Sequence, residues 1–175
     1  ALALEALVLV DVQHEEEVAR PAVPRARGSH PVQREVVAPG DAGRKLDRHH
    51  PLATNQLELS PLHMDALDDG TLDQAQQLGL RPMVWSPLAG GRLFTGEDAQ
   101  AVRVRAEMQG IAGRLGTSLA TLAFAWVLRH PSHPHPITGS GRIEGLREAV
   151  AALNVPLDAE DWYAIWTASK GHPVP

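Results

Sequence analysis

From about residue 51 onward, two patterns of hydrophobic and polar positions alternate along the chain. Short apolar runs such as Met83–Trp85 end in loops rich in Pro, Gly and Ser, and each loop leads into a segment with an apolar residue every three or four positions. This alternation predicts parallel strands with helices packed outside them, an α/β fold. Before residue 51 prolines are frequent, and only Leu7–Val12 has the character of a buried strand.

The helix-like segments are bounded by capping residues. We predict helices after Asp68–Thr71, over about Gln100–Leu115, over Leu119–Leu128, from Ile143 and from Asp158. In the helix that begins at Ile143, Leu146, Val150 and Leu153 fall on one face. The wide apolar stripe of Leu119–Leu128, which includes Trp126, is interpreted as core.

One predicted strand, Leu52–Leu59, carries two amides. A buried amide costs free energy unless it is paired. Asn55 and Gln56 therefore indicate either a polar ligand or a hydrogen-bond network between strands. We leave both alternatives open.

Composition excludes several classes of protein. The net charge is −5 and the basic residues are scattered, so nucleic acid or an anionic membrane is not expected as a partner. There is no cysteine, which excludes disulfides and thiolate chemistry. The apolar start is followed by Asp11 and three glutamates and lacks a basic leader, so we expect a soluble, cytoplasmic protein. The histidines of residues 130–135 alternate with prolines, and we interpret them as solvated loops, not as a metal site.

The run Leu80–Leu93 is the first stretch with candidate chemistry. A strand ending at Trp85 leads into Ser-Pro-Leu and then into a glycine pair, Gly90 and Gly91. Glycines let backbone N–H groups approach a ligand, Ser86 offers a hydroxyl, and an indole offers a flat face for stacking. The alternative is that the glycine pair is only a turn.

The second such stretch is Pro136–Arg142. A short strand meets Gly-Ser-Gly-Arg, and a helix is predicted to begin at Ile143. Backbone N–H groups, a helix N-terminus and an arginine together suit a phosphate. The stretch is neither a Walker loop nor a Rossmann fingerprint nor a nucleophile elbow.

These motifs resemble three consecutive strand ends of the aldo-keto reductase family. Trp-Ser-Pro-Leu-x-Gly-Gly-Arg-Leu resembles the seventh-strand motif, Asn55-Gln56-x-Glu58 the sixth, and Gly139–Arg142 the eighth. The resemblance implies a partial (β/α)8 barrel made of about the last four to five units. In this interpretation residues 51–175 are the C-terminal half of the barrel, and residues 1–50 are a poorly matched remnant of units four and five. A complete barrel typically takes about 250 residues.

The resemblance also implies a cofactor and a site. The family uses NADP(H) to reduce small-molecule carbonyl compounds. The implied cofactor-binding residues are Ser29, Asn55, Gln56, Trp85, Ser86, Leu88, Gly90, Gly91, Arg92, Gly139, Ser140, Gly141, Arg142, Arg147 and Glu148. Family members usually carry an arginine where this chain has Gly145 and often an asparagine where it has Ala149. We therefore expect binding that is weak or lost.

The family's catalytic set is an aspartate, a tyrosine, a lysine and a histidine. His14, just past the first strand, is the one candidate here, and the alternative is an ordinary loop residue. Tyr163 lies on the last predicted helix, and neither Lys45 nor Lys170 ends a strand. Two hypotheses follow: a truncated or decayed oxidoreductase that is inactive by itself, or a non-catalytic nucleotide-binding or interaction module. The open edges of a partial barrel predict self-association.

Overall fold

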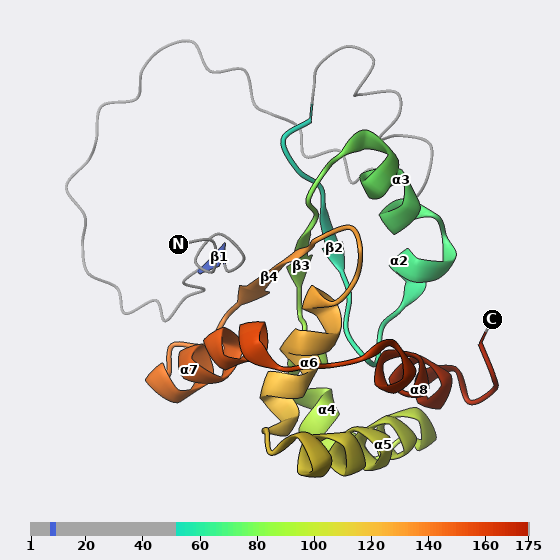
Figure 1. Ribbon diagram of the computed structural model, residues 1–175, viewed down its shortest axis with the longest axis vertical. Coiled ribbons are helices and arrows are strands. Elements are labelled where there is room, and N and C mark those ends of the chain that lie inside the picture. The colour runs from blue at the N-terminus through green and yellow to red at the C-terminus, as the bar shows by residue number, and fades with distance from the viewer. Residues whose placement is uncertain (1–7, 10–51, 175) are drawn as a thin grey trace, which may run out of the picture.

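The sheet consists of four short parallel strands. The structure is a computed structural model that describes Val8–Leu9 and residues 52–174 (Figure 1). The strands β1 (Val8–Leu9), β2 (Gln56–Glu58), β3 (Met83–Trp85) and β4 (His135–Thr138) lie in the order β1-β4-β3-β2, and every neighbouring pair is parallel. The predicted parallel α/β architecture is confirmed.

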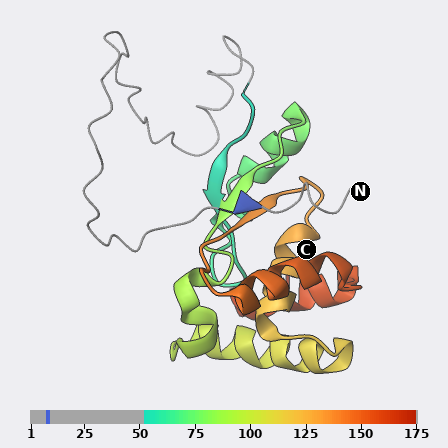
Figure 2. The ribbon, with the colours of Figure 1, turned by 90° about the vertical axis from the view of Figure 1, so that its left-hand side faces the viewer.

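Helices follow the strands along the chain. They are α2 (Asp65–Asp68), α3 (Thr71–Leu78), α4 (Arg92–Thr95), α5 (Ala99–Leu115), α6 (Leu119–Leu128), α7 (Ile143–Ala151) and α8 (Ala159–Lys170), with 3-10 turns η1 (Ala89–Gly91) and η2 (Ala152–Asn154). In Figure 1, α6 lies between α7 and α8, with α5 below it. The side view of Figure 2 shows α3 and α6 to one side of the strands, as expected for one wall of a barrel.

The two faces of the sheet differ in exposure because successive side chains of a strand point to opposite sides. Leu57, Val84 and Pro136, the middle residues of their strands, are buried. Gln56 at the start of β2 and Trp85 at the end of β3 are exposed on the other face. The helices therefore cover one face of β2, β3 and β4, and the opposite face is the one that would line a barrel.

The core is centred on α6, whose residues from Ala120 to Val127 are all buried. Trp126 of α6 and Trp162 of α8 stack with ring centroids 5.2 Å apart and an interplanar angle of 7°. Each indole N–H donates to the other residue's backbone carbonyl, at 3.1 Å from Trp126 and 2.9 Å from Trp162. This reciprocal pairing satisfies both buried N–H groups and docks α8 on α6. The interpretation of Trp126 as core is confirmed.

The predicted helices all form, with side-chain caps at three of their starts. Asp98, Ser118 and Asp158 accept hydrogen bonds from backbone N–H groups at the starts of α5, α6 and α8. At the start of α3 the cap residue is Gly70, and the Asp69 carboxylate accepts from the N–H of Thr71 at 2.8 Å. The helix ends at Gly79, which adopts a left-handed conformation.

The most buried face of α7 is not the one that carries its large apolar residues. Gly145 and Ala149 are its buried residues, whereas Val150 is 51% exposed. Ala149 packs in a cluster with Phe124 and Ala125 of α6. Small residues on α7 allow this close approach, and that advantage outweighs the burial of a larger apolar side chain.

The strand predicted at Leu52–Leu59 is shorter than expected, and its two amide side chains are exposed. The pattern predicts Leu52–Leu59, but β2 contains three residues, and Asn55 lies outside it. The side chains of Asn55 and Gln56 are exposed, so the expectation of buried amides is wrong. None of the helices in residues 52–174 covers the face of the sheet on which Gln56 lies.

In the loop between α6 and β4, the expectation that the histidines are solvated is wrong for His130. His130 is only 8% exposed, so it does not belong to a solvated loop. Its ring lies 6.2 Å from that of Trp162, and its Nδ1 is 2.9 Å from the Ser132 hydroxyl. The polar ring is buried because a local partner satisfies it.

In the part of the chain that the structure describes, no single helix is long and apolar enough to cross a membrane. Together, α5 and α6 have the length and hydropathy of a membrane-spanning segment, but the pair is bent by 94° between the two helices. Core helices of globular proteins have the same composition, and α6 is such a helix.

Candidate functional site

A cavity of about 540 Å³ lies where β3 and β4 end. The two strands are parallel neighbours, with Met83 opposite His135 and Val84 opposite Pro136, so the loops that follow them emerge at the same edge of the sheet. The lining residues are Trp85, Ser86, Pro87, Leu88, Gly90, Gly91, Phe124, Ile137, Thr138, Gly139 and Ser140. Two motifs more than forty residues apart in the sequence thus share one cavity.

The loop after β3 has an unusual backbone. Four of its residues, Ser86, Ala89, Gly90 and Gly91, have positive φ angles of 52°, 52°, 61° and 91°. For Ser86 and Ala89 this conformation is sparsely populated and costs free energy. A Cβ atom added at Gly90 or Gly91 would meet nothing within 4 Å, so open space lies beside the backbone there. Such a loop can present backbone groups to a ligand.

The loop after β4 is held by local hydrogen bonds. The N–H of Ser140 donates to the Thr138 hydroxyl at 3.3 Å, and the Ser140 hydroxyl accepts from the N–H of Arg142 at 3.3 Å. A Cβ atom at Gly145 would lie 2.3 Å from the Ser140 hydroxyl oxygen. The first turn of α7 therefore approaches the loop closely because residue 145 has no side chain.

About half of the predicted cofactor residues line this cavity. They are Trp85, Ser86, Leu88, Gly90, Gly91, Gly139 and Ser140. The predicted residues that the structure describes outside the lining are Asn55, Gln56, Arg92, Gly141, Arg142, Arg147 and Glu148. Sequence reasoning missed Phe124 of α6, because its position in an apolar stripe gives no sign that it lines the cavity.

Comparison with known proteins agrees with this arrangement of strands and loops. A family model described as the aldo/keto reductase family matches residues 35–170. The chain belongs to the aldo/keto reductase family. It is 49% identical over 125 residues to the oxidoreductase YdhF of Escherichia coli, and this match covers 71% of the chain and 41% of that protein. It is 41% identical over 124 residues to the 6-dehydroglucose reductase of Novosphingobium aromaticivorans, with the same coverage of 71% and 41%.

Solved structures support the fold of this aldo/keto reductase chain. The thermostable aldo-keto reductase Tm1743 matches with a TM-score of 0.61 and 23% sequence identity, over 73% of this chain and 44% of the other. This likeness concerns the fold, and it confirms the prediction of a partial (β/α)8 barrel. The chain spans 41% of the length of the two relatives named above.

Three charged candidates of this aldo/keto reductase chain have partners within the chain. Arg92 pairs with Asp98 at 3.1 Å, and the Ala101 N–H, followed by this contact, holds the pKa of the Asp98 carboxyl below its usual value. Arg147 lies 3.7 Å from Glu144 one turn away on α7. Glu148 accepts a hydrogen bond of 2.7 Å from the Ser118 hydroxyl. The Arg92 and Glu148 contacts join neighbouring elements, the Arg147 contact lies within α7, and all three charged candidates lie outside the cavity lining.

Gln56 lies on the same face of the sheet as Trp85. It is opposite Met83, two residues before Trp85, and its amide nitrogen is 3.9 Å from the Met83 sulfur. A ligand that covered the exposed face of the strands next to Trp85 would approach Gln56 as well. Asn55 precedes β2, so its side chain is not aligned with a residue of β3 in the way that Gln56 is.

The other candidates for catalysis lie away from the cavity or outside the described residues. Tyr163 is on α8, where its ring stacks on Trp166 at 5.7 Å, and Lys170 pairs with Asp68. His14 and Ser29 fall outside the residues that the structure describes, so their predicted roles stay predictions. Among residues 8–9 and 52–174, no group of three or more His, Asp or Glu side chains could hold a metal ion.

Proposed function

We propose that this chain is the dinucleotide-binding part of an aldo/keto reductase and that it binds NADP(H) in the cavity at the ends of β3 and β4. The observation that carries the proposal is that the Ser86–Gly91 and Gly139–Ser140 loops line one cavity of about 540 Å³. This volume is within the range of small-molecule sites. The cofactor, when bound, would supply a hydride for reduction of a small-molecule carbonyl compound.

The local chemistry suits the parts of a dinucleotide. Trp85 is 43% exposed, so its indole face is available for stacking on a flat ring. The open glycine backbone at Gly90 and Gly91 suits a pyrophosphate. The Gly139–Arg142 loop before α7 suits a terminal phosphate, since a helix N-terminus favours negative charge and Arg142 is exposed.

We propose further that the chain does not catalyse carbonyl reduction by itself. Its single tyrosine, Tyr163, stacks on Trp166, and Lys170 pairs with Asp68, so neither is available as a proton donor beside Trp85. General acid catalysis typically contributes about 10²–10⁴-fold. NADPH oxidation with aldehydes should therefore equal the background rate. Turnover by the purified chain that is lost in His14→Ala would contradict this expectation.

NADPH titration of the purified chain tests cofactor binding. Tryptophan fluorescence should change on binding, and Trp85→Phe should remove most of this signal because Trp126, Trp162 and Trp166 lie outside the cavity lining. Without an arginine at position 145, one charge-assisted contact is absent, about 1.5–3 kcal/mol. Affinity should accordingly be micromolar or weaker and should fall with added salt.

Two charge reversals at opposite ends of the sheet serve as test and control. Arg142→Glu should weaken NADPH binding about tenfold or more. Arg81→Glu changes the net charge equally but lies before β3, far along the strand from the cavity, and it should leave NADPH affinity unchanged. Equal affinities of the parent and Arg142→Glu would show that the phosphate does not lie at this loop. If neither NADPH nor NADH binds to the chain, the proposed function is refuted.

A further inference from the structure

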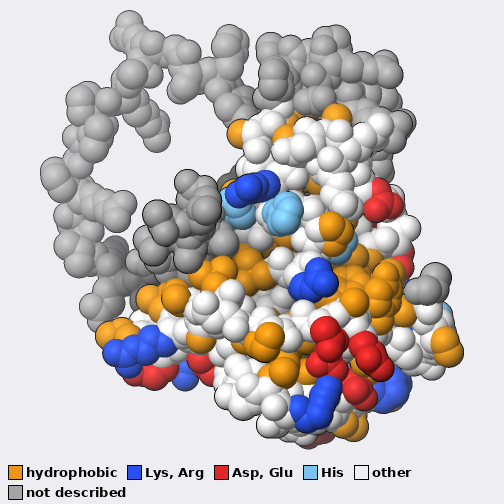
Figure 3. Space-filling view, viewed as in Figure 1, with side chains coloured by type: hydrophobic (Ala, Val, Ile, Leu, Met, Phe, Trp, Pro, Cys, Tyr) orange, Lys and Arg blue, Asp and Glu red, His pale blue; other side chains and the backbone are white. Residues whose placement is uncertain are grey.

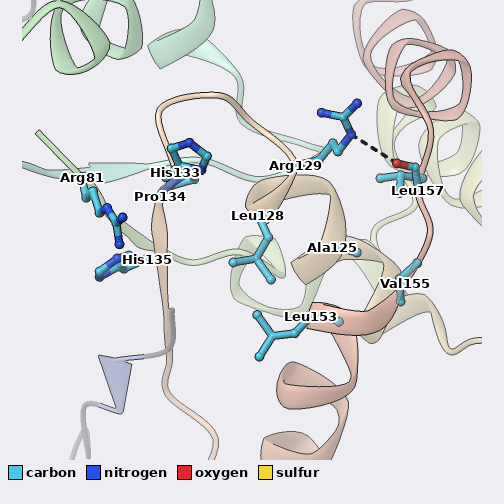
Figure 4. A pocket seen from close by; sticks show the side chains of 11 residues that line it. Arg81, Ala125, Leu128, Arg129, His133, Pro134, His135, Leu153, Val155 and Leu157 are labelled. Atoms are coloured by element: carbon cyan, nitrogen blue, oxygen red, sulfur yellow. Dashed lines mark hydrogen bonds between the residues drawn. The ribbon is translucent and has the colours of Figure 1, made fainter. Parts of the chain in front are cut away.

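A second cavity, of about 320 Å³, lies at the opposite ends of β3 and β4 from the proposed cofactor site. Arg81 precedes β3, and His133 and Pro134 precede β4. The C-terminal end of α6 and the segment after α7 complete the walls. Its lining residues are Arg81, Ala125, Leu128, Arg129, His133, Pro134, His135, Ala152, Leu153, Val155 and Leu157 (Figure 4).

Basic side chains gather in this cavity without carboxylates. Four of the eleven lining residues are Arg or His, and none of the described residues in the lining is acidic. In Figure 4 the side chains of Arg81, His133 and His135 lie close together beside the cavity. Figure 3 shows Arg and His colours next to one another on this face.

The two arginines of the cavity retain donor groups for a ligand. Within residues 52–174 the Arg81 side chain makes no ion pair or hydrogen bond, and Arg129 uses only its Nε–H, which donates to the Leu157 carbonyl at 3.2 Å (Figure 4). By contrast, Arg92, Arg114 and Arg147 each pair with a carboxylate. The guanidinium of Arg81 and the remaining N–H groups of Arg129 can therefore donate to a bound anion.

The end of α6 explains only part of this arrangement. The C-terminus of a helix favours nearby cations, and Arg129 follows the last residue of α6. Arg81 and His135 belong to the starts of two strands, so the helix does not account for them. His133 has a φ of 50°, a strained conformation for a residue with a side chain, in the turn before β4.

The rest of the wall is apolar. Leu128 and Leu153 point toward the cavity in Figure 4, and Ala125, Ala152 and Val155 extend the same surface. A volume of 320 Å³ equals about ten water molecules at roughly 30 Å³ each. The cavity therefore matches a small molecule with one charged head and a short hydrocarbon body.

We propose that this cavity binds a small amphipathic carboxylate, whose head contacts Arg81 and His133 and whose hydrocarbon body lies against Leu128 and Leu153. Guanidinium groups match carboxylates geometrically through paired N–H donors. The assignment does not depend on cofactor binding, because this cavity and the proposed cofactor cavity share no lining residue.

Calorimetric titration of the full chain with octanoate tests the proposal. Octanoate should bind saturably, and Arg81→Gln and His133→Gln should each weaken binding about tenfold or more, whereas Arg81→Lys should retain part of the affinity. Arg142→Gln, at the other end of β4, should leave octanoate binding unchanged. NADPH affinity should show the opposite pattern, reduced by Arg142→Gln and not by Arg81→Gln.

Octan-1-ol and inorganic phosphate are the matched probes. Both should bind much more weakly than octanoate, because each lacks one of the two features that the cavity recognises. Octan-1-ol binding as tightly as octanoate would overturn the role of the basic cluster, and equal binding of phosphate would overturn the role of the apolar wall. Absence of saturable octanoate binding, or equal loss in Arg81→Gln and Arg142→Gln, would overturn the site itself.

Discussion

At the scale of a single residue, His130 shows how a titratable group is tolerated in the core. It follows α6 closely, is 8% exposed, and packs near Trp162. Its Nδ1 lies within hydrogen-bond distance of both the hydroxyl and the backbone N–H of Ser132, at 2.9 and 3.2 Å. Burial lowers the pKa of His130 from its usual value of 6.5, the charge of Asp73 opposes this shift, and His133 adds to it.

The lowered pKa of His130 predicts a loss of stability in mild acid. Below about pH 6.5 the unfolded chain binds a proton at this position before the folded chain does, so the free energy of unfolding falls as pH decreases toward the lower folded pKa. In His130→Asn, which keeps an acceptor near Ser132, this part of the decrease should disappear. Urea unfolding from about pH 8 to about pH 5 measures the two slopes. Identical slopes for parent and variant would contradict the assignment.

At the scale of an element, Ser118 connects two helices. Its hydroxyl oxygen accepts from the N–H of Thr121 at 3.1 Å as the cap of α6, and the same hydroxyl lies 2.7 Å from the carboxylate of Glu148 on α7. One side chain thus begins the central helix and attaches α7, the helix that follows the Gly139–Arg142 loop. The register of α7 places small residues against α6 and turns Glu148 toward Ser118.

Removal of this cap should destabilise the fold. Ser118→Ala should lower the free energy of unfolding by about 0.5–2 kcal/mol, the usual loss for an N-cap serine. Ser118→Thr retains the hydroxyl and should cost less. Glu148→Ala removes only the link to α7 and should have a small effect, since the contact is exposed. Equal losses of unfolding free energy in Ser118→Ala and Glu148→Ala, measured by urea unfolding, would show that Ser118 stabilises the fold through its link to α7 and not as the cap of α6.

At the scale of the whole molecule, the residues that the structure describes cover the sheet on one face only. Leu57 and Val84 face the helices, while Gln56, Glu58 and Trp85 line the opposite face with partial or full exposure. β2 has a single neighbour, β3, in the sheet formed by the described residues. An open strand edge and an exposed tryptophan together form a surface on which another chain can dock.

This surface predicts self-association. Sedimentation velocity should show an average mass that rises with protein concentration. Gln56→Lys places a charge on the edge strand and should reduce association, whereas Val102→Lys adds the same charge to an exposed position on α5 and should not. A monomer at all concentrations, or equal effects of the two substitutions, would contradict the prediction.

The period of apolar residues by itself determined most of the elements, and the family followed from the resemblance of the motifs at the strand ends. It predicted Leu119–Leu128 to the residue and the strand at Met83–Trp85, because hydrophobic spacing and capping residues are local signals. The glycine motifs after β3 and β4 also predicted which loops line the cavity, since neighbouring parallel strands end at the same edge of a sheet.

Tertiary packing decided which face of each element is buried and which side chains meet. Spacing placed Val150 on one apolar face with Leu146 and Leu153, yet α7 turns Gly145 and Ala149 inward because small residues let two helices approach closely. The partners of Arg92 and Glu148, and the burial of His130, depend on elements distant in the sequence or on the fold of a turn. The basic cavity of Arg81 and His133 has the same origin, since residues fifty-two positions apart come together only when β3 and β4 pair.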